Sequence, residues 1–142
     1  MFYSDLVKKA AKISFKAHKR DYDKSGYPYF MHPMTLALQF DDEASVCVAL
    51  LHDVIEDHGD IYSFETLKEK GFYPETIDAL RLLTHEEGVP YLDYVGAIKS
   101  NPIARRVKLA DLRHNSDLRR CDGKKPPKYD LYLEAIRILE DQ

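Results

Sequence analysis

The sequence has few cysteines, no long apolar run and no strong excess of one charge sign. Its two cysteines, Cys47 and Cys121, are too few for a disulfide framework. The longest apolar run, around 46–51, is far too short to span a bilayer, and the N-terminal stretch MFYSDLVKKA lacks a long apolar signal region. The formal net charge of −3 gives no general attraction to nucleic acid or membranes. We therefore expect a soluble cytoplasmic protein.

The composition is that of an ordinary globular protein. Apolar residues make up 44% of the 142 residues and charged residues 32%, which excludes a disordered chain and allows one domain, 1–142, with a real core. Apolar positions recur at intervals of three and four and not of two. We therefore predict an all-α, single-domain helical bundle.

The helix boundaries follow from caps, prolines and glycines. Helices are expected over 4–18, after His32-Pro33, over 41–57, 63–71 and 74–83, from Pro90, over 101–120 and over 129–141. The buried faces are expected to carry Leu6, Ala10, Ile13 and Ala17 in the first helix and Leu92, Val95 and Ile98 in the helix from Pro90. The polar stretch 19–29 is expected to be a loop, and 124–127 a break.

A histidine and three carboxylates follow an apolar stretch in ALLHDVIED. His52 and Glu56 are four residues apart, as are Asp53 and Asp57, so each pair shares a face of the predicted helix. Burying such groups without partners is costly, and negative charge at a helix C-terminus opposes the helix dipole. A divalent cation would resolve both conflicts. The alternative is a solvated helix end with a hydrogen-bonded core histidine.

The segment RRVKLADLRHNSDLRR holds a second polar group. Lys108, Asp111 and Asn115 lie beside the inward face of the predicted helix, at spacings of three and four. Because Asp111 is flanked by apolar residues, it fits a simple exposed face poorly. It is a candidate ligand, unless it pairs with Arg105 or His114 in a surface ladder.

The third candidate is His32 in YPYFMHP, which alone would be an ordinary loop histidine. Together, His32, His52, Asp53 and Asp111 offer two imidazoles and two carboxylates, which suit one divalent ion such as Mn, Fe, Co or Zn. The lack of ligating cysteines argues against a structural zinc site. Such a set would leave positions for water and a phosphate oxygen, so metal-assisted hydrolysis is the expected chemistry.

These residues, in this order, resemble the H…HD…D signature of the HD-domain metal-dependent phosphohydrolases. The motifs PYFMHP, ALLHDVIED and VKLADLRHN resemble those of one branch, the hydrolase domain of the RelA/SpoT enzymes and the small alarmone hydrolases. The resemblance covers about 6–118. HD alone is a weak dipeptide, but HDxxED together with KLADxxHN is a specific combination.

The resemblance implies a helical bundle that holds one Mn ion through the four ligand residues. It also implies that Glu56 and Asp57 position and deprotonate the attacking water. The reaction implied is removal of the 3′-pyrophosphate from guanosine tetra- or pentaphosphate. The chain ends soon after the hydrolase motifs, so we expect no pyrophosphokinase activity.

The substrate-binding candidates are Lys24, Asn115, Arg20 and Lys108. Asn115 resembles an asparagine that contacts the substrate. The segment HKRDYDKSGYPYFMHP departs from the family's HxxQxRKxGxPYxxHP, because Asp21 and Asp23 stand at the glutamine and arginine positions. That arginine is implicated in holding the nucleotide, and an acid there would repel phosphates. Arg20 could substitute for it. LADLRHN also differs in order from the family's LADRLHN.

Three other functions compete with the alarmone hydrolase. The chain could be an HD nucleotidase acting on another nucleoside phosphate, a non-catalytic nucleotide-binding regulatory module, or a purely structural helical protein. A binder has no need of Glu56 and Asp57, which favours an enzyme. We expect a small-molecule nucleotide as partner, with no nucleic acid polymer and no membrane. Homo-oligomerisation stays open, and the C-terminal helix could be a packing cap or a subunit contact.

Overall fold

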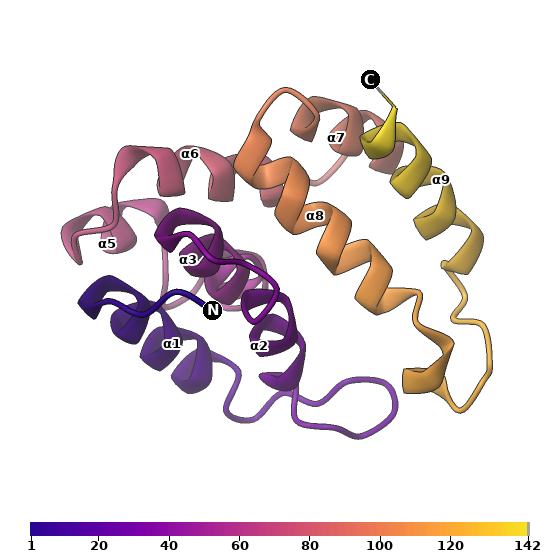
Figure 1. The fold of residues 1–142 in the computed structure, drawn as a ribbon, viewed down its shortest axis with the longest axis horizontal. Helices are drawn as coiled ribbons and strands as arrows, with labels where there is room; N and C mark the ends of the chain where they lie inside the picture. The colour runs from indigo at the N-terminus through magenta and orange to yellow at the C-terminus, as the bar shows by residue number, and fades with distance from the viewer. Residues whose placement is uncertain (142) are drawn as a thin grey trace.

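The protein is a bundle of α-helices in a computed structural model that describes residues 1–141 (Figure 1). The elements are α1 (Asp5–Ala17), α2 (Met31–Ala37), α3 (Glu43–Leu51), α4 (Val54–Asp57), α5 (Phe64–Glu69), α6 (Pro74–Leu83), α7 (Tyr91–Ile98), α8 (Pro102–Asn115), the 3-10 turn η1 (Leu118–Cys121) and α9 (Tyr129–Glu140). Within residues 1–141 there is no strand, only an isolated bridge between Tyr22 and Pro28. The predicted all-α fold is confirmed.

Helix α3 lies at the centre of the bundle. Its sequence, EASVCVALL, is apolar on all sides after the first turn, and every residue of 45–51 is buried. Helices α1, α2, α6 and α8 all pack against it. A helix without a polar face is stable only where other helices surround it. This central position brings His52, which follows the last residue of α3, into the interior of the bundle.

Local capping explains most of the helix starts. The side chains of Ser4, Asp42 and Ser63 each accept a backbone N–H of the helix that follows. Asn101 does the same for α8, with Pro102 in the first turn. The predicted boundaries of α6 and α9 are also confirmed to within one residue.

The buried faces differ slightly from those predicted. In α1 the buried residues are Val7, Ala10, Ile13 and Ser14, whereas Leu6 and Ala17 are only partly buried. In α7 Val95 and Ile98 are buried as predicted, but Tyr94 takes the place of Leu92. Apolar spacing fixes the period of a helix face, and the neighbouring helices then decide its exact rotation.

The single helix predicted over 41–57 is wrong, because the chain turns between α3 and α4. His52 caps the end of α3, and Asp53, with φ −106° and ψ −2°, caps the start of α4. On an uninterrupted helix adjacent side chains project about 100° apart. The turn removes this constraint, so His52 and Asp53 can face the same point.

The predicted end of the helix from 101 is also wrong, since α8 stops at Asn115 and not near Arg120. The hydroxyl of Ser116 donates back to the carbonyl of Leu112, 2.8 Å away. Asp117 then caps the turn η1 by accepting the backbone N–H of Arg119. Local side-chain bonds of this kind compete with helix continuation.

The loop between α1 and α2 reaches across to the segment that follows α8 (Figure 1). The hydroxyl of Ser25 donates to the carbonyl of Arg120 at 2.8 Å, which ties the two segments together. Helices α8 and α9 pack side by side, and α9 also contacts α7. No helix in the described part of the chain is long and apolar enough to cross a membrane.

Candidate functional site

The four predicted metal ligands converge between α2, the turn after α3, and α8. The Nε2 atom of His32 lies 2.8 Å from Oδ1 of Asp111. The Nε2 atom of His52 lies 3.0 Å from Oδ2 of Asp53 and 3.4 Å from Oδ1 of Asp111. Ligand atoms bound to one ion at about 2.1 Å lie about 3.0–3.4 Å from one another. Ligand atoms of His32, His52 and Asp53 all lie within 4.8 Å of one another, close enough to hold one cation, and Asp111 lies within 3.4 Å of both histidines.

His52 is prepared to act as a ligand. Its Nδ1–H donates to the carbonyl of Ala49 at 2.7 Å, so Nε2 is the ring nitrogen that faces the two carboxylates. Nε2 is buried and makes no hydrogen bond, although two carboxylates are close. A buried ring nitrogen without a partner is costly and uncommon. A metal ion would supply the missing partner.

The electrostatics of the site favour a positive charge. Burial opposes a charged His52, but Asp53 and Asp111 outweigh it and raise the pKa of His52 well above its usual value. Burial likewise opposes ionisation of Asp53, yet His52 lowers the pKa of that carboxyl to about 2. The pKa of Asp111 is held well below its usual range, against burial, mainly by Lys108. Both carboxylates are therefore ionised, as metal ligands must be.

Asp111 is held in place by two further side chains of α8. The ammonium group of Lys108 donates to Oδ2 at 2.9 Å, and the amide of Asn115 donates to Oδ1 at 3.1 Å. Lys108 is nearly buried and also lies 5.3 Å from the ring centre of Tyr94. Lys108 thus faces Asp111 and does not project into an open cleft.

Tyr29 and His114 orient the other two ligands. The hydroxyl of Tyr29 donates a short hydrogen bond to Asp53. Burial and the charge of Asp53 raise the pKa of Tyr29, so the hydroxyl keeps its proton. Nδ1 of His114 lies 2.6 Å from Nδ1 of His32. Partners that hold a ligand's orientation in this way are typical of metal centres.

Glu56 and Asp57 lie on α4, at the rim of the site. Asp57 lines two hollows, both of which also contain Tyr29. Partial burial, together with the charges of Asp53 and Glu56, raises the pKa of Asp57 to about 6. Glu56 accepts the backbone N–H of His85 at 2.7 Å. Asp57 is therefore the carboxylate best poised to exchange a proton near neutral pH.

A cleft of about 530 Å³ lies between the loop that follows α1 and the segment after α8, and its wall contains none of the four candidate ligands themselves. Two residues of the wall, Tyr29 and Asn115, hydrogen-bond to Asp53 and Asp111. The wall also holds Asp57 and three cations, Lys24, Arg120 and Lys128. Arg20 lies outside this cleft, in a neighbouring hollow of about 450 Å³ that also contains Asp57. Of the four substrate-binding candidates, Lys24 and Asn115 therefore share the cleft, whereas Arg20 and Lys108 do not.

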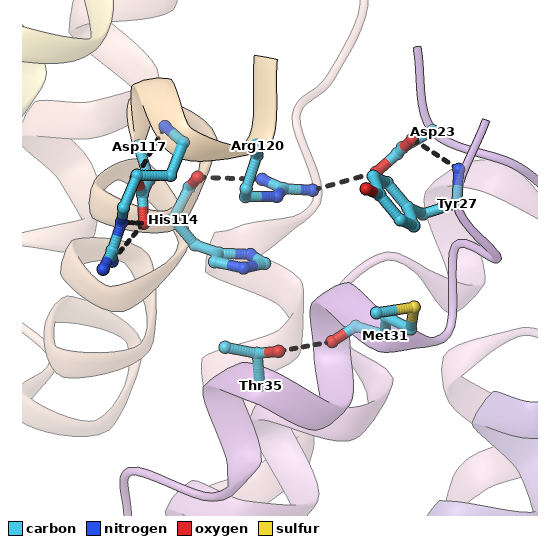
Figure 2. A pocket seen from close by; sticks show the side chains of 8 residues that line it. Asp23, Tyr27, Met31, Thr35, His114, Asp117 and Arg120 are labelled. Carbon is cyan, nitrogen blue, oxygen red and sulfur yellow. Dashed lines mark hydrogen bonds and ion pairs between the residues drawn. The ribbon is translucent and has the colours of Figure 1, made fainter. Parts of the chain in front are cut away.

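The carboxylate of Asp23 forms an ion pair with Arg120, which is far from it in the sequence. Oδ2 of Asp23 lies 3.5 Å from Nη2 of Arg120, and Oδ1 accepts the backbone N–H groups of Ser25 and Tyr27. Arg120 also donates to the carbonyl of His114 at 2.8 Å. Figure 2 shows Arg120 reaching from η1 between His114 and Asp23. The pair holds the Arg120 guanidinium group at the wall of the cleft that Asp57 also lines.

Three residues at the site were not found from the sequence: Tyr29, His114 and Arg120. Tyr29 and His114 each stand three residues from a predicted ligand, but the ligands that they contact, Asp53 and His32, are 24 and 82 residues away in the sequence. Arg120 had no such signal, because its position depends on where α8 ends.

The chain is similar to curated enzymes that are named for guanosine nucleotides. The chain is 35% identical over 118 residues (72% of this chain, 17% of the relative) to the guanosine-3′,5′-bis(diphosphate) 3′-pyrophosphohydrolase of Haemophilus influenzae. It is 29% identical over 123 residues (78% and 15%) to a Mycobacterium leprae protein named a probable GTP pyrophosphokinase. It is 47% identical over 58 residues (37% and 8%) to a GTP pyrophosphokinase of Myxococcus xanthus.

These matches span less than a fifth of each relative's length. No family model matches the chain. The relatives are nevertheless of one kind, and the match to two of them extends over most of this chain. The homologues of this chain are thus RelA/SpoT-family enzymes, and its all-helical bundle fits their HD hydrolase domain.

Proposed function

We propose that the protein is a divalent-metal-dependent phosphohydrolase, with His32, His52, Asp53 and Asp111 as the ligands of one ion. The observation that carries this proposal is the buried Nε2 atom of His52, which has no hydrogen-bond partner and lies within 3.4 Å of two ionised carboxylates. Two imidazoles and two carboxylates suit Mn, Fe, Co or Zn, and manganese is the ion we expect because the resemblance to the RelA/SpoT hydrolase domain implies it. When bound there, a divalent cation supplies Lewis-acid polarisation of a phosphoryl oxygen.

The protein's own groups then position and deprotonate the attacking water. Asp57, with its pKa raised to about 6, is the carboxylate that accepts the proton. Glu56, whose carboxylate accepts the backbone N–H of His85, is the second group that we propose positions the water. Asn115 donates to Asp111 and lines the cleft, so its amide lies between the ligand and the substrate.

The substrate we propose is a guanosine tetra- or pentaphosphate, from which water displaces the 3′-pyrophosphate and leaves a 3′-hydroxyl group. The printed names of the relatives from Haemophilus influenzae and Mycoplasma pneumoniae support this choice. So do Lys24, Arg120 and Lys128, which place positive charge along the cleft. Another nucleoside phosphate is the alternative substrate.

A substrate screen tests the proposal. Full-length protein loaded with manganese is incubated with guanosine tetraphosphate and with nucleoside mono-, di- and triphosphates, and the products are identified by mass. We expect pyrophosphate and guanosine diphosphate from the tetraphosphate. Release of phosphate or pyrophosphate from another nucleotide alone would show that the substrate is that nucleotide. No release from any of them would refute the proposed hydrolase activity.

Two kinds of variant test the metal ligands and the proposed general base independently. Asp53→Ala should lose the ion held by His32, His52 and Asp111, and hydrolysis with it. Asp57→Asn and Glu56→Gln should keep the metal but slow turnover by roughly 10²–10⁴, the usual effect of losing a general base. Full activity in a metal-free Asp53→Ala protein would refute the ligand assignment.

A further inference from the structure

A second cluster of histidine and aspartate lies where α1 and α4 end. His18 follows the last residue of α1, and His58 follows the last residue of α4. Oδ2 of Asp21 lies 3.0 Å from Nδ1 of His18 and 2.6 Å from Nε2 of His58. Two imidazole nitrogens therefore converge on a single carboxylate oxygen. None of these residues belongs to the first group of ligands.

The cluster is closed on its inner side and open on its outer side. The side chain of His18 has no exposed surface, whereas Asp21 and His58 keep 32% and 22% of theirs. Asp21 and His58 line the hollow of about 450 Å³ that also holds Arg20 and Asp57. An ion could enter from this hollow and keep water on its open face.

The ring of His18 is held only on the side that faces the cluster. Its Nε2 atom is buried without any hydrogen-bond partner, so only the cluster at Nδ1 fixes the ring. Burial lowers the pKa of His18, and the hydrogen bond from His58 lowers the pKa of Asp21. A neutral imidazole beside an ionised carboxylate is the protonation state that metal binding requires.

We propose that His18, Asp21 and His58 form a second divalent-metal site, distinct from the site at His52. Two imidazoles and one carboxylate suit a borderline ion, and zinc, with water as fourth ligand, fits this set best. On binding, the ion replaces the two ring protons that now point at Asp21. Each proton moves to the other nitrogen of its own ring, so no net charge is lost from the histidines. Asp21 is partly exposed and can shift outward to make room.

The ion would link the ends of α1 and α4. His18 also lies against Tyr29, with ring centres 4.8 Å apart, and the hydroxyl of Tyr29 donates to Asp53. His58 directly follows Asp57 in sequence. The second ion would thus hold the segment that carries the proposed base, without itself contacting the substrate.

Zinc titration of the chelator-stripped full chain tests this proposal, with calorimetry and elemental analysis as readouts. We expect two equivalents for the natural protein. Asp21→Asn and His58→Gln should each bind one, and so should Asp53→Ala, which removes the other site. Asp60→Asn is the matched control, because it removes an exposed acid near His58 and should keep both equivalents.

The outcomes distinguish the two sites. Cobalt absorption bands that vanish in His58→Gln but persist in Asp53→Ala would assign the second ion directly, even if Asp21→Asn folds poorly. One equivalent in the natural protein, unchanged by His58→Gln and abolished by Asp53→Ala, would reduce the cluster to hydrogen bonds and overturn the proposal. That result would leave the proposed hydrolase site intact.

Discussion

The Nδ1 atoms of His32 and His114 lie 2.6 Å apart, and their ring planes are only 9° from parallel. One of the two nitrogens must donate and the other accept. Burial and the neighbouring His32 lower the pKa of His114 to about 4, so His114 is neutral and can accept. His32 then carries its proton on Nδ1 and has its Nε2 lone pair available on the side of Asp111.

This pairing predicts that His114 supports metal binding without touching the ion. His114→Ala should weaken manganese affinity by about 10- to 100-fold, the usual cost of losing an orienting partner of a ligand histidine. Calorimetric titration measures the change. Arg113→Ala is the control, because Arg113 is the preceding residue but points outward to Glu140. Equal affinities in both variants would show that His114 does not orient His32.

A second prediction concerns nucleotide binding by Arg120. Arg120→Ala should raise the KM for a guanosine tetraphosphate at least about tenfold, since charge-assisted hydrogen bonds contribute about 1.5–3 kcal/mol. Manganese content should not change. The neighbouring Arg119, exposed and paired with Asp117, gives the control Arg119→Ala, with little expected effect. Loss of metal in Arg120→Ala would instead show that Arg120 supports the metal site through Asn115 and Asp111.

Asp23→Asn should have the opposite effect on KM. The asparagine oxygen can still accept the N–H groups of Ser25 and Tyr27, so the loop keeps its turn. Removing the charge frees Arg120 for an anionic substrate, and KM should fall by up to about fivefold, the scale of an exposed ion pair. A KM that rises would mean that Asp23 is needed to hold Arg120 in place.

The sequence predicts the helices of this bundle well, because caps and apolar periodicity are local signals. It does not predict the turn at His52–Asp53, because the run from 46 to 51 is apolar throughout and no glycine or proline interrupts it. That break depends on the tertiary structure: His52 faces Asp111 of α8, and Asp53 accepts the hydroxyl of Tyr29 from the loop before α2. Propensity alone would have continued the helix.

The cleft is less predictable than the candidate ligands. The four ligand residues stand in recognisable motifs, and the structure brings them together. In contrast, Arg120 and Lys128 reach the cleft only because α8 stops at Asn115 and the chain folds back through η1. The second cluster joins His18 and His58, which are forty residues apart. Such contacts follow from packing and leave no spacing pattern to detect.

The raised pKa of Asp57 gives a prediction for the pH dependence of hydrolysis. A base must be ionised, so activity should be full above the pKa of Asp57, about 6, and fall as the pH drops through it. A bound cation favours the carboxylate and moves this midpoint downward. With saturating manganese, kcat should fall on the acid side with a midpoint at or below pH 6. Asp57→Asn should abolish that fall along with most of the activity; a residual rate with the same midpoint would assign the fall to another group.

The last prediction concerns stability, and rests on the nearly buried contact between Lys108 and Asp111, 2.9 Å apart. Lys108→Met removes the cation and leaves the buried carboxylate uncompensated, which typically costs about 3–5 kcal/mol. A divalent ion bound to Asp111 would restore much of this loss. Manganese should therefore raise the free energy of unfolding of the variant by more than that of the natural protein, as measured by urea unfolding with manganese and with chelator. Lys99→Met, which loses only a partly exposed lysine 3.9 Å from Asp141, is the control and should respond to manganese as the natural protein does. If Lys108→Met were destabilised equally in both conditions, Asp111 would not be a ligand of the ion.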